Sequence, residues 1–229
     1  MTRVGVVSYP GACDDRDAMH AIGLMGAEPV ALWHADADLH GVDAVIVPGG
    51  FSYGDYLRPG ALAALSPVMA AVAAHASGGR PVLGICNGFQ VLTETGLLPG
   101  VLMRNASLKF VCRDVHLKVE QPDTLFTSHY RRGEVIRIPI AHGDGNYFAD
   151  PTTLDELEAE GRVVFRYVDK TGNATADANP NGAQRNIAGI CDRSRRILGM
   201  MPHPERLFEP RLGGSDGRRM FEGLLATLH

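Results

Sequence analysis

A glycine stands two residues before and two residues after Cys86, where a short apolar run ends. Residues 84–88 (Gly-Ile-Cys-Asn-Gly) thus have the spacing of a nucleophile elbow, in which a strand turns sharply into a helix and lifts one side chain above the turn. The backbone is crowded on both sides of such a turn, and glycine lacks the Cβ atom that would clash there. A simple core strand has no use for two glycines so placed. The segment therefore predicts a strand, a sharp turn and a helix in succession.

The predicted turn also gives Cys86 a chemical setting. A thiol at a helix N-terminus faces unpaired N–H groups and the positive end of the helix dipole, and both favour the thiolate. The N–H of Asn87, directly after the cysteine, is placed by the elbow to donate to an oxyanion. The alternative is an inert cysteine in a core strand, because free cysteine is among the most buried residue types.

Short apolar segments alternate with helical patterns in the first half of the chain. Strands are expected at residues 4–9, 29–33, 42–47 and 82–86, and helices at residues 14–25 and from Pro59 onward, with Pro67 as a possible kink. This alternation is typical of a parallel sheet with helices on both faces, whose sites form beyond the carboxyl ends of the strands.

The second half of the chain has a different pattern, with strands joined by short connections. They are expected at residues 111–119, 135–140, 163–168, 187–191 and 197–201, with helices near residues 154–160 and 220–228 and a loop at 171–185. We predict a single α/β domain over residues 1–229, with a flavodoxin-like, mainly parallel central sheet and antiparallel additions in the C-terminal half.

Charge and cysteine usage exclude several classes of protein. The formal net charge is −4, which gives no general electrostatic case for binding nucleic acid or anionic membrane. The four cysteines show neither a C-x-x-C pair nor zinc-ligand spacing, so no metal site is expected. The chain has no run of about 20 apolar residues and no signal-peptide pattern. A reducing cytoplasm is therefore the expected location.

A nucleophilic thiol needs a base that is itself oriented, and His203 is the candidate among nine histidines. It follows an apolar strand in the sequence Met-Pro-His-Pro-Glu at residues 201–205. Pro204 biases His203 toward extended backbone, in which residues 203 and 205 point to the same side. Glu205 would then hold the imidazole. Taken alone, this segment is equally compatible with a surface turn.

Two further strand ends carry glycines beside polar residues. Residues 48–51 (Pro-Gly-Gly-Phe) suit a second oxyanion donor at Gly50, because glycines let backbone N–H groups turn toward a ligand; a plain tight turn is the alternative. Residues 142–147 (His-Gly-Asp-Gly-Asn-Tyr) suit a substrate loop, or else a solvated hairpin turn.

Taken together, these motifs resemble the class I, triad-type glutamine amidotransferases. The match is more specific to the glutaminase subunits of phosphoribosylformylglycinamidine synthases, above all through Gly-Gly-Phe-Ser-Tyr-Gly-Asp-Tyr-Leu-Arg at residues 49–58. The segments that carry the resemblance are residues 48–60, 84–90, 142–145, 179–182 and 199–205.

The resemblance implies a catalytic triad of Cys86, His203 and Glu205, an oxyanion hole at Gly50 and Asn87, and a γ-glutamyl thioester intermediate. It further implies hydrolysis of L-glutamine in purine biosynthesis, with ammonia passed to a separate large synthetase subunit, with or without a small bridging subunit. ATP and Mg²⁺ would be used by that partner, and no cofactor is expected in this chain. Substrate-binding residues are expected to be Gly49, Phe51, Gln90, His142, Gly143 and Asn146, and partner-interface residues Tyr56 and Arg58.

Two other functions stay open from the sequence. One is the glutaminase subunit of a different class I amidotransferase. The other is a binding module on the same scaffold that keeps the elbow cysteine as a redox sensor. The presence of both His203 and Glu205 argues against a sensor, because a sensor needs no base.

Overall fold

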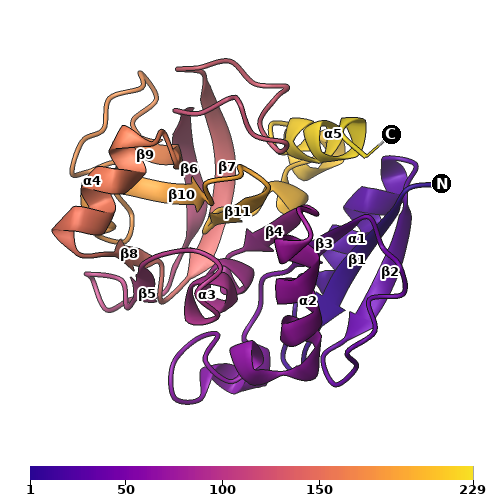
Figure 1. The fold of residues 1–229 in the computed structure, drawn as a ribbon. Coiled ribbons are helices and arrows are strands. Elements are labelled where there is room, and N and C mark those ends of the chain that lie inside the picture. The colour runs from indigo at the N-terminus through magenta and orange to yellow at the C-terminus, as the bar shows by residue number, and fades with distance from the viewer. Residues whose placement is uncertain (229) are drawn as a thin grey trace.

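A single nine-stranded sheet runs through both halves of the chain in the computed structural model, which describes residues 1–228 (Figure 1). In spatial order the strands are β2 (Glu28–Trp33), β1 (Arg3–Ser8), β3 (Ala44–Val47), β4 (Val82–Ile85), β11 (Ile197–Met200), β10 (Ile187–Cys191), β9 (Val163–Val168), β6 (Val111–Val119) and β7 (Val135–His142). The pairs from β2 to β11 are parallel, and those from β11 to β7 are antiparallel. The expected α/β sheet with antiparallel additions is confirmed.

Burial explains which strands occupy which part of the sheet. Every residue of β3, β4 and β11 is buried, as continuous apolar runs must be when both faces of a parallel sheet are covered. In β7 buried residues alternate with partly exposed ones, because one face of this antiparallel edge packs on the core and the other meets solvent.

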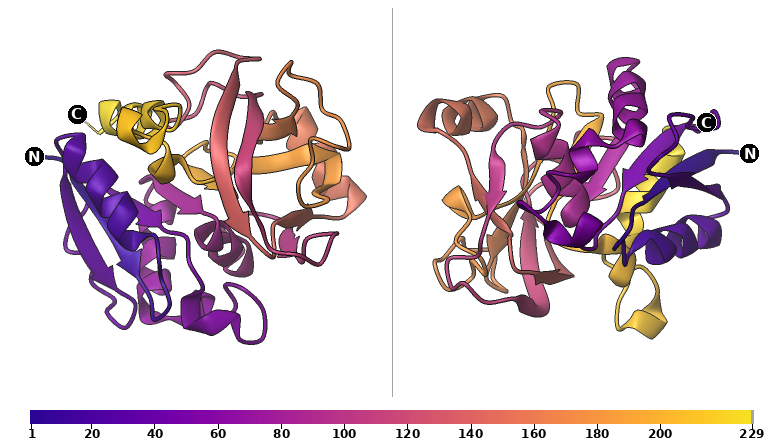
Figure 2. Two further views of the ribbon diagram at one scale, coloured as in Figure 1. Left: turned by 180° about the vertical axis from the view of Figure 1, so that it is seen from behind. Right: turned by 90° about the horizontal axis from the view of Figure 1, so that it is seen from below.

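Five α-helices and a small second sheet complete the fold of residues 1–228. The helices are α1 (Asp15–Leu24), α2 (Pro67–Ser77), α3 (Asn87–Glu94), α4 (Pro151–Ala159) and α5 (Arg218–Ala226), and the small sheet pairs β5 (Val101–Met103) with β8 (Asn146–Phe148). Helices α1 and α5 lie on one face of the parallel strands and α2 on the other (Figures 1 and 2). Neither β5 nor β8 was expected, because three residues are too few to show a periodic pattern.

The helix expected from Pro59, with a kink at Pro67, is wrong. A short 3₁₀ turn at Ala63–Leu65 is followed by Ser66 in extended conformation, and α2 begins only at Pro67. Proline disfavours helical backbone in the residue before it and suits the first helical position. Leu65, the last residue of the 3₁₀ turn, is 82% exposed.

None of the helices within residues 1–228 combines the length and apolar character that crossing a membrane requires.

Candidate active site

Cys86 occupies the strained turn that the glycine spacing predicts. Its backbone has φ 51° and ψ −106°, between the end of β4 and the start of α3. A Cβ atom on Gly88 would lie 1.8 Å from the carbonyl oxygen of Val47, and one on Gly84 would lie 2.8 Å from the carbonyl oxygen of Gly88. Both positions therefore require glycine, and the crowding around them holds the cysteine in its strained, positive-φ conformation.

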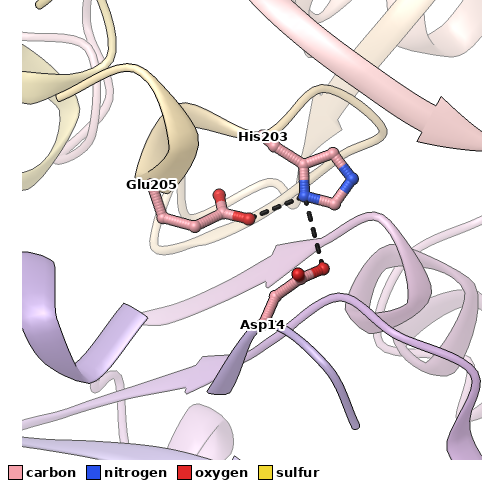
Figure 3. A group of neighbouring side chains, drawn as sticks. All are labelled: Asp14, His203 and Glu205. Carbon is pink, nitrogen blue, oxygen red and sulfur yellow. Dashed lines mark hydrogen bonds and ion pairs between the residues drawn. The ribbon is translucent and has the colours of Figure 1, made fainter. Parts of the chain in front are cut away.

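The sheet brings His203 to Cys86 from the far end of the chain. Strand β11 pairs in parallel with β4, with Met200 opposite Ile85, so the segments after both strands leave the same edge of the sheet. His203 is 1% exposed, and its Nε2 has no partner among the described residues. Its Nδ1 lies 2.6 Å from Glu205 Oε1 (Figure 3). The imidazole is thus oriented from the Nδ1 side, which leaves Nε2 for proton transfer.

The contact between His203 and Glu205 arises by a route other than the extended segment expected from the sequence. His203 has φ −106° and ψ 88°, and residues Pro204–Arg206 form a 3₁₀ turn. Pro204 supplies the fixed φ that starts this turn. The turn folds Glu205 back toward the imidazole, and both side chains are buried.

Electrostatics favour a charged His203. Burial opposes the charged form, but the Glu205 carboxylate and the Cys86 thiolate outweigh it and raise the pKa of His203 well above its usual value. The neighbouring His142 behaves oppositely, because burial and then the charge of His203 lower its pKa to about 3. At neutral pH, His142 is therefore neutral, whereas the surroundings of His203 favour its charged form.

A cavity of about 220 Å³ opens in front of Cys86. Of the residues predicted from sequence, Gly50, Phe51, Cys86, Gln90, His142 and Gly143 line it. Gly50 has φ 139°, a conformation that glycine tolerates best. Asn87 is the first residue of α3, where a backbone N–H has no partner within the helix. Of the two residues expected to form the oxyanion hole, Gly50 thus lines the cavity together with Cys86, and Asn87 directly follows Cys86 in the chain.

Other predicted residues have different surroundings. The amide of Gln90 is engaged by the protein: its Oε1 accepts from Asn87 Nδ2 at 2.8 Å, and its Nε2 donates to the carbonyl oxygen of Asp144 at 2.7 Å. Gly49 and Asn146 are not among the residues that line the cavity. Arg58 is paired with Glu94 of α3 at 2.5 Å, whereas Tyr56 is 74% exposed.

The structure adds residues that the sequence did not single out. Arg104, Asp55 and Asp144 line the same cavity. Burial, and secondly Asp144, raises the pKa of Asp55 to about 6, and Asp55 Oδ1 is buried without a partner in residues 1–228. Asp55 lies within the predicted family-specific segment. Asp144 lies within the predicted substrate loop at residues 142–147 but was not singled out there. Arg104 carried no local signal, since single charges in loops are common.

Donor atoms of Asp14, His203 and Glu205 lie within 4.8 Å of one another, a grouping that can suit a metal ion (Figure 3). The Arg206 guanidinium already binds Asp14, and a protonated His203 would repel a cation. We therefore interpret the three side chains as a hydrogen-bonded acid–base group.

The fold and the strained cysteine beside a carboxylate-held histidine define a glutamine amidotransferase, and the family model for the CobB/CobQ-like glutamine amidotransferase domain matches residues 1–212. A structure described as a glutamine amidotransferase from Thermotoga maritima, 16% identical, shares the fold with a TM-score of 0.59 and covers 99% of this chain and 96% of that one.

More specific matches narrow the family. The chain is 57% identical over 226 residues to phosphoribosylformylglycinamidine synthase subunit PurQ of Chlorobaculum tepidum, covering 98% of this chain and 97% of the relative. It is 45% identical, with a TM-score of 0.89, to a chain in the structure of PurLQS from Thermotoga maritima, covering 100% of this chain and 99% of that one. The chain belongs to the PurQ family of phosphoribosylformylglycinamidine synthase subunits.

Proposed function

We propose that this chain is the glutaminase subunit of a phosphoribosylformylglycinamidine synthase and hydrolyses L-glutamine at Cys86 to supply ammonia for purine biosynthesis. The observation that carries the proposal is the strained Cys86 beside a buried His203 whose Nδ1 is 2.6 Å from Glu205, in a chain of the PurQ family. A redox sensor has no need of this buried base.

The proposed reaction begins with attack of the Cys86 thiolate on the side-chain amide carbon of glutamine. The N–H groups of Asn87 and Gly50 stabilise the oxyanion that forms. His203 Nε2–H protonates the departing ammonia, which leaves a γ-glutamyl thioester on Cys86. His203 then removes a proton from water, whose attack on the thioester releases glutamate and the thiolate. Glu205 holds the imidazole tautomer and stabilises its charged form throughout.

The cavity also has groups suited to the two charged groups on the α-carbon of glutamine. Arg104 supplies a cation for the α-carboxylate of glutamine. Asp55, with its unpartnered buried oxygen, and Asp144 supply acceptors for the α-ammonium group. Binding at these groups would leave the side-chain amide free to reach Cys86, which lines the same cavity.

We expect replacement of Arg104 by methionine to raise the KM for glutamine about tenfold or more with a smaller effect on kcat. The reason is the loss of a charge-assisted contact worth about 1.5–3 kcal/mol that the substrate makes in ground state and transition state alike. Steady-state glutaminase assays would measure this. The control is Arg113→Met, an arginine on the exposed part of β6. A large fall in kcat at unchanged KM would contradict the assigned role.

The exposed side chains beside the cavity fit a protein partner. Phe51, Leu108 and Phe110 line the cavity and are 46%, 71% and 53% exposed. Tyr56 and Leu57, 74% and 83% exposed, lie in the adjoining segment. Such apolar exposure is typical of an interaction surface. We propose that the large synthetase subunit docks here, and that the assembly includes a small subunit, as the name PurLQS indicates for the Thermotoga maritima complex.

The synthetase would use ATP and Mg²⁺ to activate the amide of formylglycinamide ribonucleotide, which ammonia converts to the amidine. This chain has no G-x-x-x-x-G-K-[ST] phosphate loop, in keeping with ATP binding on the partner. A reducing cytoplasm suits the chemistry, because the nucleophile must remain a thiol.

A glutamine analogue that carries a chloroketone in place of the amide should alkylate Cys86 alone, as read by peptide mass spectrometry. Cys13 and Cys112 are exposed and serve as internal controls for non-specific reaction. Protection of Cys86 by excess glutamine is expected. Two results would favour the sensor alternative. One is failure to label Cys86 in the complex with its synthetase, and the other is labelling of the exposed Cys13 and Cys112 in preference to Cys86.

A further inference from the structure

A second carboxylate faces the histidine that we propose as the base (Figure 3). Asp14 Oδ2 lies 3.6 Å from His203 Nδ1, too far for a hydrogen bond, while Glu205 Oε1 lies at 2.6 Å on the same nitrogen. Asp14 is 2% exposed, so water screens its charge little. His203 therefore has two buried anions on its Nδ1 side.

The Asp14 side chain does not cap the helix that it precedes. Asp14 is the N-cap residue of α1, where aspartate normally accepts a hydrogen bond from the first turn of the helix. Here the side chain makes no capping hydrogen bond. Its Oδ1 binds Arg206 Nη2 instead, and its Oδ2 faces the imidazole. Both oxygens of the carboxylate thus face side chains of the segment 203–206.

Gly49 makes this approach possible. A Cβ atom at this position would lie 2.3 Å from Asp14 Oδ2 and 2.8 Å from His203 Cε1. The carbonyl oxygen of Gly49 also accepts a hydrogen bond from the N–H of Asp14 at 3.3 Å. This bond holds the Asp14 backbone beside Gly49. The resemblance implies a substrate-binding role for Gly49. In addition, its lack of a side chain leaves the space in which the Asp14 carboxylate approaches the His203 imidazole.

We propose that Asp14 and Arg206 are a positioning pair that sets the charge balance of His203, with Asp14 favouring the imidazolium and Arg206 opposing it. The inference rests on the proposed role of His203 as the acid and base of glutamine hydrolysis. Arg206 binds Asp14 from the side away from the imidazole and lies 4.0 Å from Asp17. Asp14 Oδ2 lies 3.6 Å from Nδ1, so its charge acts on the imidazole directly.

The charged and titratable groups around His203 come from every element packed against it. They are Cys86 at the elbow, His142 at the end of β7, Glu205 in the 3₁₀ turn that follows His203, Asp14 on the Nδ1 side, and Arg206 and Asp17, which are linked to Asp14. Asp14 and Arg206 carry opposite charges and neither belongs to the triad, so each charge can be removed separately.

The test compares Asp14→Asn with Arg206→Met in the complex with the synthetase, by measuring glutamate release across pH. Loss of an anion 3.6 Å from Nδ1 lowers the pKa of the imidazolium, so the alkaline limb of kcat should move down by about 1 pH unit or more in Asp14→Asn. Loss of the guanidinium leaves Asp14 unopposed, and the same limb should move up in Arg206→Met. The KM for glutamine should change little in both.

Matched controls are Asp36→Asn, at an exposed position, and Arg218→Met, whose partner Glu222 lies on the surface of α5. Neither should move the limb. Synthesis from added ammonia by the same complexes should keep the wild-type pH profile. A purely structural role would lower thermal stability without opposite pH shifts.

The inference would be overturned if the alkaline limb of kcat stayed in place in both Asp14→Asn and Arg206→Met, or if it moved in the same direction in both. If Asp14→Asn fails to fold, the upward shift in Arg206→Met still decides it. Failure of the proposed function would look different: wild-type protein would then release no glutamate at any pH in the complex.

Discussion

Replacing Cys86 by alanine is expected to abolish glutamine-dependent formation of the amidine product while leaving ammonia-dependent formation near the wild-type rate. The substitution removes the sulfur that attacks the amide carbon, and no other cysteine is among the described residues that line the cavity. The rate of glutamate release should fall on the order of 10³-fold or more. Ammonia added to the solution bypasses this site, because the proposed synthetase reaction takes place on another polypeptide.

The measurement is made in the complex with the synthetase, with glutamine or with ammonium as the nitrogen source. Cys191→Ala is the matched control, because Cys191 is also a buried cysteine at a strand end but belongs to β10 and does not line the cavity. It should keep both activities. Loss of both activities in Cys86→Ala would mean that the cysteine supports the assembly rather than the chemistry. Retained use of glutamine would refute the mechanism.

Replacing Gly88 by alanine is expected to destabilise the whole domain. The added Cβ would lie 1.8 Å from the carbonyl oxygen of Val47 and 2.6 Å from its carbonyl carbon. Both are backbone atoms of the buried strand β3, which cannot move aside as the end of a side chain could. Overpacking of this kind costs about 3 kcal/mol, which corresponds to a fall of about 10 °C in the melting temperature of a domain of this size.

Gly23→Ala is the control for that substitution. Gly23 lies within α1, and a Cβ atom there would have no atom within 4 Å. Alanine favours the helix over glycine by up to about 1 kcal/mol, so this variant should melt at or above the wild-type temperature. Thermal unfolding followed by circular dichroism would compare the two. Equal melting temperatures would show that α3 can shift away from β3 without cost.

The strands and the elbow could be predicted from the sequence because their signals are local. A continuous apolar run marks a strand covered on both faces, and the paired glycines around Cys86 mark a turn that other residues cannot adopt. Prediction failed where two local rules competed. At Pro59 and Pro67 each proline suits a helix start, and only the second one begins a helix that packs against the sheet.

The sequence also pointed to His203 and Glu205, but for a reason that the backbone does not follow. Alternation along an extended segment predicted that they share a side, whereas the structure joins them through a 3₁₀ turn. The outcome is similar because either geometry can bring side chains two residues apart into contact.

The sequence by itself determined the α/β class, the strained cysteine and the residues that could serve as its base, since each depends on residues close together in the chain. Only the tertiary structure decided what surrounds them. The parallel pairing of β4 with β11 brings Cys86 and His203 to one edge of the sheet. From its position in the chain, Asp14 is typical of a helix N-cap. In the structure, the space left by Gly49 and the contact with Arg206 direct its carboxylate toward the imidazole. Burial and charge pairing between distant segments leave no local pattern, because they depend on which strands become neighbours.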